Sequence, residues 1–181
     1  MIYELPEGYY VRALYEGDLA GAYPRWFEDQ EACKYNSHGK FAKNSSWFRG
    51  FYDSANNEDR VVWAVCHRDD GHIGNISLQQ MSFINRNAEF AILIGDGRHR
   101  GKSVGKSAGL TLLKHGFDKL NLERIYCGTA ATNIGMQRLA HSLGMREEGR
   151  RRSHLYLEGE WVDMLEYGVL KHEFAALRTG E

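Results

Sequence analysis

The feature that most constrains the fold is an apolar strand pattern that runs through a glycine-rich, lysine-bearing turn into a helical pattern. The stretch "NAEFAILIG" (87–95) is apolar on both faces, which is typical of a central strand that is covered on both sides. Beyond the turn, apolar residues recur at spacings of three, four and three, which predicts a helix face: Leu110, Leu113, Phe117 and Leu120. A turn of this kind between a strand and a helix is a common way of holding phosphates.

Other patterns predict strands and helices on either side of this unit. Strands are predicted where valine and aromatic residues gather or where apolar residues alternate: 9–14, 60–67, 72–83, 123–130 and a hairpin over 151–170. Helices are predicted after the candidate caps Asp18 and Asn133, and around 47–52. The predicted order is β-α-α-β-β-β-α-β-α-β-β. This order indicates an α/β fold with a mixed central sheet of about seven strands, in a single domain over residues 1–181.

The composition is that of an ordinary globular protein, with 43% apolar and 26% charged residues. No window of eighteen apolar residues predicts a membrane span, and the N-terminus lacks the layout of a signal peptide. Three widely spaced cysteines, an odd number, indicate reduced thiols and a cytoplasmic protein: Cys33, Cys66 and Cys127. We therefore expect no membrane partner.

Charge is balanced overall but uneven along the chain. A net charge of −1 argues against nucleic-acid binding. Between Gly97 and Phe117, however, there is no acidic residue, and five cationic residues stand there: Arg98, Arg100, Lys102, Lys106 and Lys114. This local excess of positive charge suits an anionic ligand.

Two familiar phosphate-binding motifs do not match the turn. The triplets Gly101-Lys102-Ser103 and Gly105-Lys106-Ser107 look like the end of a nucleotide-triphosphate loop, but Asp96 and Arg100 stand where its first glycine is required. The dinucleotide motif also fails, because Arg100 replaces its third glycine. What remains is an anion cradle of backbone N–H groups that needs no metal.

The turn resembles the pyrophosphate loop of the GCN5-related N-acetyltransferase (GNAT) superfamily, Arg/Gln-x-x-Gly-x-Gly/Ala. Here it reads Arg100-Gly101-Lys102-Ser103-Val104-Gly105, with Ser103 in place of the first loop glycine. The stretch "AEFAI" (88–92) is similar to a motif of the RimJ/RimL-like branch, and so is Asn133 followed by Gly144. The resemblance spans essentially the whole chain, and it implies a GNAT fold with acetyl-CoA as donor and no metal.

By this resemblance, the cofactor would bind along the central strand and the turn. Its pyrophosphate would lie on Arg100, Gly101, Lys102, Ser103, Val104, Gly105 and Lys106. Its pantetheine arm would run beside the backbone of Ile92, Leu93 and Ile94, where an N–H group would polarise the thioester carbonyl. Asn133 would reach the pantetheine, and Met136 stands where the branch usually has a serine.

The candidate catalytic residues are Glu89 and Tyr126. Glu89 is the only acid between Asp70 and Asp96, and it precedes the expected thioester site, so it is the candidate general base; alternatively it is a solvated glutamate at a strand start. The tyrosine acid of many relatives is replaced by Ala140, which leaves Tyr126 as a weaker candidate, with His154 and Tyr156. Cys127 in an apolar strand is expected to be a packing residue.

The acceptor side is the least determined by the sequence. An aromatic and polar segment (23–41) supplies candidate pocket residues, and a strand of the hairpin supplies one more: Trp26, Tyr35, Asn36, Ser37, His38 and His154. Trp26 could equally pack a helix against the sheet. The favoured acceptor is a small-molecule amine such as a nucleotide-linked amino sugar, and the alternative is a peptide N-terminus. A nucleotide-phosphate enzyme and a non-catalytic acyl-CoA sensor remain open, as do a monomer and a homodimer.

Overall fold

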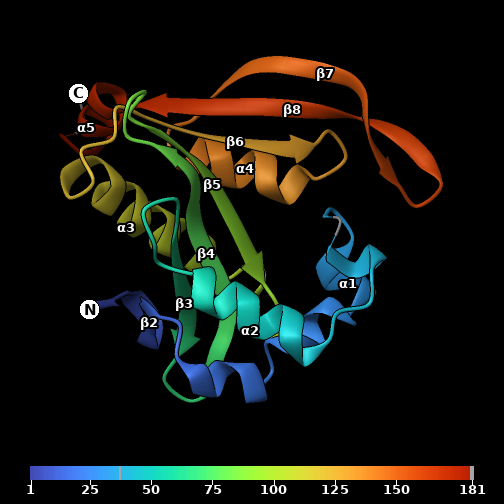
Figure 1. The fold of residues 1–181 in the computed structure, drawn as a ribbon. Helices are drawn as coiled ribbons and strands as arrows, with labels where there is room; N and C mark the ends of the chain where they lie inside the picture. Colours follow the sequence, from blue (N-terminus) through green and yellow to red (C-terminus); the bar gives the residue numbers. More distant parts are fainter. Residues whose placement is uncertain (37, 180–181) are drawn as a thin grey trace.

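The computed structural model describes residues 1–36 and 38–179, except for the side chains at positions 38, 178 and 179. An eight-stranded sheet runs through the molecule in the order β1-β2-β3-β4-β5-β6-β8-β7 (Figure 1). Its strands are β1 (Ile2–Glu4), β2 (Tyr9–Ala13), β3 (Val61–His67), β4 (Gly71–Ser82), β5 (Asn87–Ile94), β6 (Arg124–Ala130), β7 (Arg146–Leu157) and β8 (Glu160–Leu170). Only β5 and β6 pair in parallel, so the sheet is mixed, as the sequence predicts.

Five α-helices and five short 3-10 helices connect or flank the strands in the described part of the chain. The α-helices are α1 (Gln30–Cys33), α2 (Ser45–Ser54), α3 (Val104–Asp118), α4 (Ile134–Ser142) and α5 (Lys171–Thr179). The 3-10 helices are η1 (Pro6–Gly8), η2 (Glu16–Ala20), η3 (Pro24–Phe27), η4 (His38–Lys40) and η5 (Gly97–His99). No helix in the described ranges is long and apolar enough to cross a bilayer. The sequence patterns did not reveal β1 or α5.

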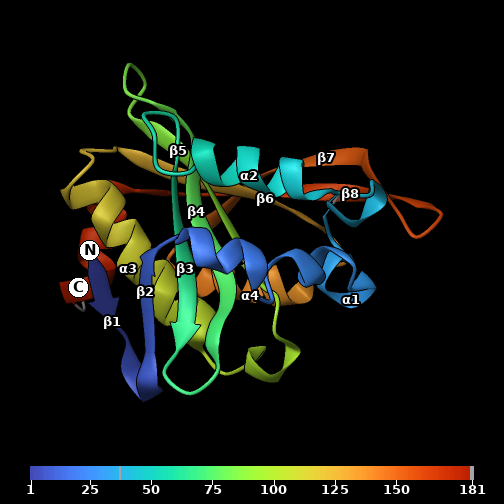
Figure 2. The ribbon, with the colours of Figure 1, turned by 60° about the horizontal axis from the view of Figure 1, so that its bottom comes forward.

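Helices cover the sheet on both faces (Figure 2). Alternate residues of β3 show this directly: Trp63 and Val65 join the large core under α3 and α4, whereas Val62 and Ala64 join a smaller cluster with residues of α2. Because side chains alternate across a strand, a strand buried on both faces reads as a continuous apolar run. The predicted central position of β5 is confirmed, since it lies between β4 and β6.

The prediction of a helix capped by Asp18 is wrong. Asp18 lies inside η2 with 8% of its side chain exposed, and both of its oxygens accept hydrogen bonds from the Arg12 guanidinium at 2.8 Å. Its Oδ2 also accepts from the Tyr15 amide at 2.8 Å. Asp18 therefore binds Arg12 of β2 and does not cap a helix. The segment that follows forms short 3-10 turns instead of one helix.

Asp18 provides a stability prediction that depends on pH. Burial alone would raise the pKa of Asp18, but hydrogen bonds from Arg12, His72 and the Tyr15 amide hold that pKa well below its usual range. A depressed pKa in the folded state adds stability above the unfolded-state pKa of about 4, and this stability is lost as the pH falls below it. We expect Asp18→Asn to lower the unfolding free energy by about 2 kcal/mol at neutral pH. Urea denaturation at several pH values should show this gap shrinking in acid, and a gap of constant size would contradict the assignment.

Candidate active site

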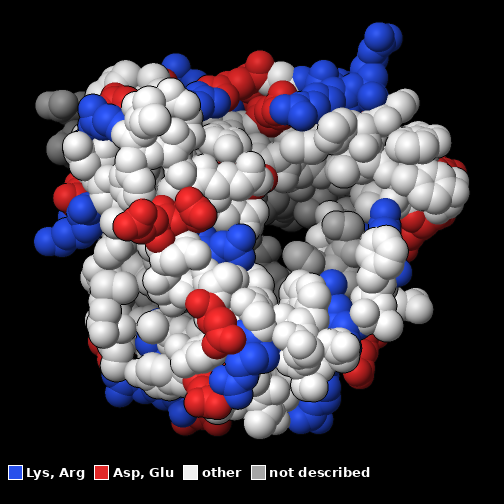
Figure 3. Space-filling model, viewed as in Figure 1, with Lys and Arg blue, Asp and Glu red and all other residues white. Residues whose placement is uncertain are grey.

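The strands β5 and β6 separate part-way along their length. They pair only from Asn87 to Glu89 on β5 and from Arg124 to Tyr126 on β6, although both strands continue beyond these positions. The edge of β5 that faces β6 is therefore left without a strand partner over its second half, and such an edge can bind another extended chain. Figure 3 shows the surface hollowed between the part that carries α4, β7 and β8 and the part that carries α1 and α2.

Apolar side chains line the separation on the side of the main core. Ile92 and Ile94 on β5, with Met136 and Leu139 on α4, are partly buried and pack against that core. A Cβ added to Gly105 would lie 3.6 Å from atoms of Ile92 and Leu139, so the first turn of α3 lies against the same wall. The separation between the strands is thus continuous with the start of α3.

The start of α3 is suited to an anion. Ser103 precedes the helix in the left-handed conformation (φ 60°), and its side chain does not cap the helix. Gly101 also has a positive φ of 77°. Alternating conformations of this kind turn successive N–H groups to one side, and the first N–H groups of a helix lack intrahelical partners. These groups, the positive end of the helix dipole and the nearby Lys102 and Lys106 fit a pyrophosphate.

Arg100 binds backbone carbonyl groups at the start of the loop. Its Nε donates to the carbonyl of Ile94 at 2.9 Å, and its Nη2 donates to the carbonyl of Gly95 at 3.0 Å. The side chain thus ties the loop to the end of β5 and takes up the last carbonyl of the strand. The sequence predicts it beside the phosphates; the structure instead directs its guanidinium at the backbone of the loop.

Asn133 begins α4, as the sequence predicts. Its Oδ1 accepts a hydrogen bond from the Met136 amide at 3.1 Å, which is the geometry of a helix N-cap. This contact uses only Oδ1 of the side-chain amide, and Met136, three residues further on, is half-buried. An N-cap asparagine that keeps its amide donors is well placed to meet an amide carbonyl of a pantetheine arm.

Glu89 lies at the closed end of the separation. Its neighbours Ala88 and Phe90 are buried in the main core, so its own side chain points to the opposite face of the sheet. Its Oε2 accepts hydrogen bonds from Gln79 Nε2 at 2.9 Å and from Gln80 Nε2 at 2.7 Å. Two amide donors on one oxygen hold the carboxylate in place, and Oε1 makes no hydrogen bond among the described residues.

The sequence patterns did not identify Gln79 and Gln80 as residues of the candidate site. A β-bulge in β4 lies between Gln79 and Ser82, and Gln80 has a positive φ of 51°. The bulge lets two consecutive side chains reach the same carboxylate, although consecutive residues of a regular strand point to opposite faces. The two adjacent glutamines in the predicted strand 72–83 were the available signal.

Tyr126 is the direct neighbour of Glu89 across the two strands. Burial raises the pKa of its hydroxyl first, and the Glu89 carboxylate raises it further. Tyr126 is therefore protonated at neutral pH and can donate a proton. By contrast, Cys127 is 1% exposed and burial raises the pKa of its thiol to about 12, so it is a packing residue, as expected.

The described candidate acceptor residues lie in different surroundings. Tyr35 lines a cavity of about 470 Å³ between α1 and the turn of the β7–β8 hairpin, together with Lys34, Thr132, Leu157, Glu158, Glu160 and Val162. Asn36 is half-buried, and its Nδ2 donates to the Ala32 carbonyl at 3.4 Å. His154 is exposed on the edge strand β7. Ser37 and the side chain of His38 lie outside the described residues.

Trp26 packs instead of lining this cavity. Its side chain is 6% exposed, and its ring lies against Gly95 and edge-on to His72 and Tyr23. The structure therefore supports the alternative that Trp26 is a packing residue and not part of the acceptor pocket. Within the described ranges, no three His, Cys, Asp or Glu side chains lie close enough together to hold a metal ion.

Residues 10–146 match the family model of the acetyltransferase (GNAT) domain. The chain belongs to this acetyltransferase family. A spermidine N-acetyltransferase from Vibrio cholerae, solved with CoA and spermine, superimposes with a TM-score of 0.82 at 23% identity and covers 93% of this chain and 98% of its own. At that identity the likeness shows a shared GNAT fold.

Curated relatives match by sequence as well. YdaF of Bacillus subtilis, whose name suggests a ribosomal N-acetyltransferase, is 32% identical over 106 residues, which are 58% of this chain and 57% of YdaF. A spermidine N(1)-acetyltransferase of Vibrio cholerae is 29% identical over 102 residues, which are 56% of this chain and 58% of the relative. The chain thus spans little more than half the length of these two relatives.

Proposed function

We propose that this protein transfers the acetyl group of acetyl-CoA to the primary amine of a small molecule. One observation carries the proposal: the separation of β5 from β6 connects an uncapped helix start at Ser103 with a fixed carboxylate at Glu89. The first can hold phosphates and the second can accept a proton, and the unpaired edge of β5 lies between them. Membership of the GNAT family supports this reading.

Each part of the site has a defined role in this proposal. The turn before α3 binds the phosphates of the donor, and the edge of β5 aligns its extended arm, so that the thioester lies near Glu89. A protonated amine has no lone pair, so Glu89 removes its proton before attack, directly or through water. A backbone N–H of β5 stabilises the charge that develops on the carbonyl oxygen. Tyr126 returns a proton to the departing thiolate.

The charge of the 470 Å³ cavity beside Tyr35 favours a cationic acceptor. Glu158 and Glu160 line it, and Lys34 is the only basic residue among the described residues that do so. These carboxylates attract an amine with further positive charges and repel the diphosphate of a nucleotide-linked amino sugar. We therefore favour a linear polyamine over an amino sugar, which agrees with the named substrate of the Vibrio cholerae relative. A peptide N-terminus is the second candidate, supported by the name of YdaF and by the RimJ/RimL-like motif at 88–92.

A panel of acceptors tests the proposal. The protein is incubated with acetyl-CoA and, separately, with polyamines, amino sugars, nucleotide-linked amino sugars and N-terminal peptides, and the products are examined by mass spectrometry. Acetylated polyamine is the expected result. CoA binding without any acetylated product would favour an acyl-CoA sensor, and binding of ATP without CoA would contradict the proposal.

The double variant Glu158→Gln/Glu160→Gln tests the acceptor cavity. We expect the KM for a polyamine to rise by about three- to tenfold, the size of two exposed ion pairs, and the KM for acetyl-CoA to stay the same. The matched control is Glu28→Gln/Glu31→Gln, which removes two exposed acids near α1 that do not line the cavity. Equal changes in both double variants would contradict a specific role for the cavity.

The state of the cysteines bears on the cellular compartment of the protein. The three cysteines are buried and free of disulfide bonds, in agreement with a reducing compartment, and we therefore place the protein in the cytoplasm.

A further inference from the structure

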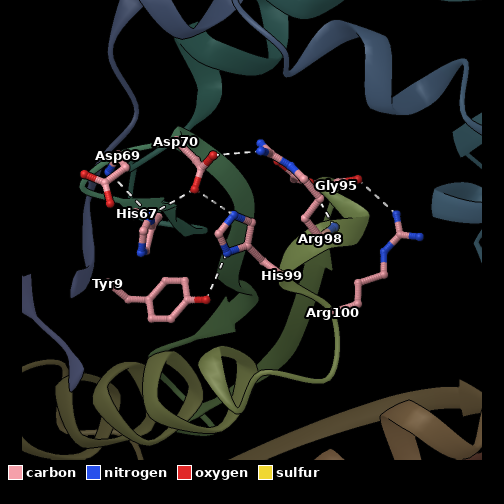
Figure 4. Close-up of polar contacts among 9 residues, drawn as sticks. Tyr9, His67, Asp69, Asp70, Gly95, Arg98, His99 and Arg100 are labelled. Atoms are coloured by element: carbon pink, nitrogen blue, oxygen red, sulfur yellow. Dashed lines mark hydrogen bonds and ion pairs between the residues drawn. The ribbon is translucent and has the colours of Figure 1, made fainter. Parts of the chain in front are cut away.

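A chain of polar side chains anchors the loop between β5 and α3. His99, which is 3% exposed, is the buried residue of η5 within this loop. Its Nδ1 lies 2.9 Å from the hydroxyl of Tyr9 on β2, and its Nε2 lies 3.3 Å from Oδ2 of Asp70 in the β3–β4 turn (Figure 4). His99 therefore joins the loop to two parts of the sheet that are distant in sequence.

Asp70 is the centre of this cluster. Besides His99, it contacts His67 Nδ1 at 3.1 Å and Arg98 Nη1 at 2.9 Å (Figure 4). Arg98 also binds Asp96 at 2.6 Å, so both ends of η5 are tied into the network. A single carboxylate thus receives one contact from β3 and two from the loop that leads to α3.

The protonation of Tyr9 sets the direction of its hydrogen bond to His99. Burial raises the pKa of Tyr9 first, and the negative charges of Glu7 and Asp70 raise it further. The Tyr9 hydroxyl therefore keeps its proton and can donate to His99 Nδ1. In this contact His99 Nδ1 is the acceptor, and Nε2 on the other side of the ring faces Asp70. His99 Nε2 makes no hydrogen bond among the described residues, so Asp70 acts on the ring through an electrostatic contact at 3.3 Å.

The group formed by Tyr9, His99 and Asp70 lies next to the start of α3. Tyr9 lines a cavity of about 210 Å³ whose other wall includes Lys102, Ser103 and Lys106. Only three residues separate His99 from Ser103, whose conformation sets the direction of the first N–H groups of the helix. A shift of the His99 ring would therefore move the groups that are placed to meet a phosphate.

We propose that Tyr9, His99 and Asp70 are positioning residues that set the affinity for the phosphate end of CoA by fixing the loop before α3. The inference rests on the proposed function, which puts the pyrophosphate at residues 101–106. None of the three residues needs to touch the reacting atoms. Their effect is expected on donor binding and not on the chemical step.

Two conservative variants test the proposal. Tyr9→Phe removes one hydroxyl, and Asp70→Asn removes the charge at the centre of the cluster. We expect each to raise the KM for acetyl-CoA and the Kd for CoA by about five- to tenfold, with kcat unchanged. Tyr9→Phe loses one buried hydrogen bond, and Asp70→Asn loses the charge that faces His67, Arg98 and His99. The matched controls are the adjacent Tyr10→Phe, whose ring packs on the other face of the sheet, and Asp69→Asn, which is exposed and keeps its backbone contact to His67.

A second donor separates positioning from a general loss of structure. S-acetylpantetheine carries the thioester but no pyrophosphate, so its KM should be the same in the native protein and in both variants. Equal increases with both donors, or no increase with acetyl-CoA, would overturn the inference. If Asp70→Asn does not fold, Tyr9→Phe alone still tests the inference. A native protein that neither binds CoA nor acetylates an amine would instead contradict the proposed function.

Discussion

Replacement of Glu89 by glutamine is expected to lower kcat by about 10²- to 10³-fold and to leave the Kd for CoA nearly unchanged. The amide has the shape of the carboxylate and can still accept a hydrogen bond from Gln79 or Gln80, so the site keeps its geometry. It cannot take the proton of an ammonium group. The loss should therefore fall on the chemical step, which a comparison of kcat with CoA titration will show.

The control for this variant is Glu58→Gln, at an exposed position between α2 and β3. A comparable loss of kcat in the control would indicate an effect of net charge alone. A second readout comes from Tyr126, because the Glu89 carboxylate helps to raise the pKa of its hydroxyl. Removal of that charge should lower the pKa of Tyr126. A Glu89→Gln enzyme with native kcat would remove Glu89 from the role of base.

The substitution Gly95→Ala is expected to lower the unfolding free energy by about 3 kcal/mol. An added Cβ would overlap the indole of Trp26, which is held between Gly95, His72 and Tyr23. Gly95 also donates its N–H to the Ile73 carbonyl at 2.9 Å and accepts from Arg100, so the backbone has little freedom to retreat. The strain would fall on the loop that begins the phosphate site, and CoA affinity should fall with stability.

Gly50→Ala is the matched control for this prediction. Gly50 lies inside α2, where an added Cβ meets nothing within 4 Å, so alanine should stabilise the helix by about 0.5–1 kcal/mol. In urea denaturation, the midpoint concentration should therefore fall for Gly95→Ala and rise for Gly50→Ala. The double variant Gly95→Ala/Trp26→Phe should lose less than the sum of its parts, because the smaller ring makes room. Strict additivity would show that the indole is not the obstacle.

Local patterns in the sequence were enough for most of the fold. The apolar run of β5, the helical spacing of α3 and the cap at Asn133 are each confirmed, because strands, helices and caps depend on residues within a few positions of one another. The segment 15–40 shows the limit of this reasoning. Asp18 has the residue type of a helix cap, yet Arg12 on a neighbouring strand binds both of its oxygens.

The sequence by itself determined the α/β class, the order of the main elements and the position of the glycine-rich turn before α3, since all three follow from periodicity and from residues close together in the chain. Only the tertiary structure decided that Arg100 binds the backbone, that Gln79 and Gln80 hold Glu89, and that Trp26 packs on Gly95. Only it joined Tyr9 to His99, ninety positions apart. Such contacts depend on how the strands pair and where β5 and β6 separate, and this is determined by the packing of the whole sheet rather than by any local pattern.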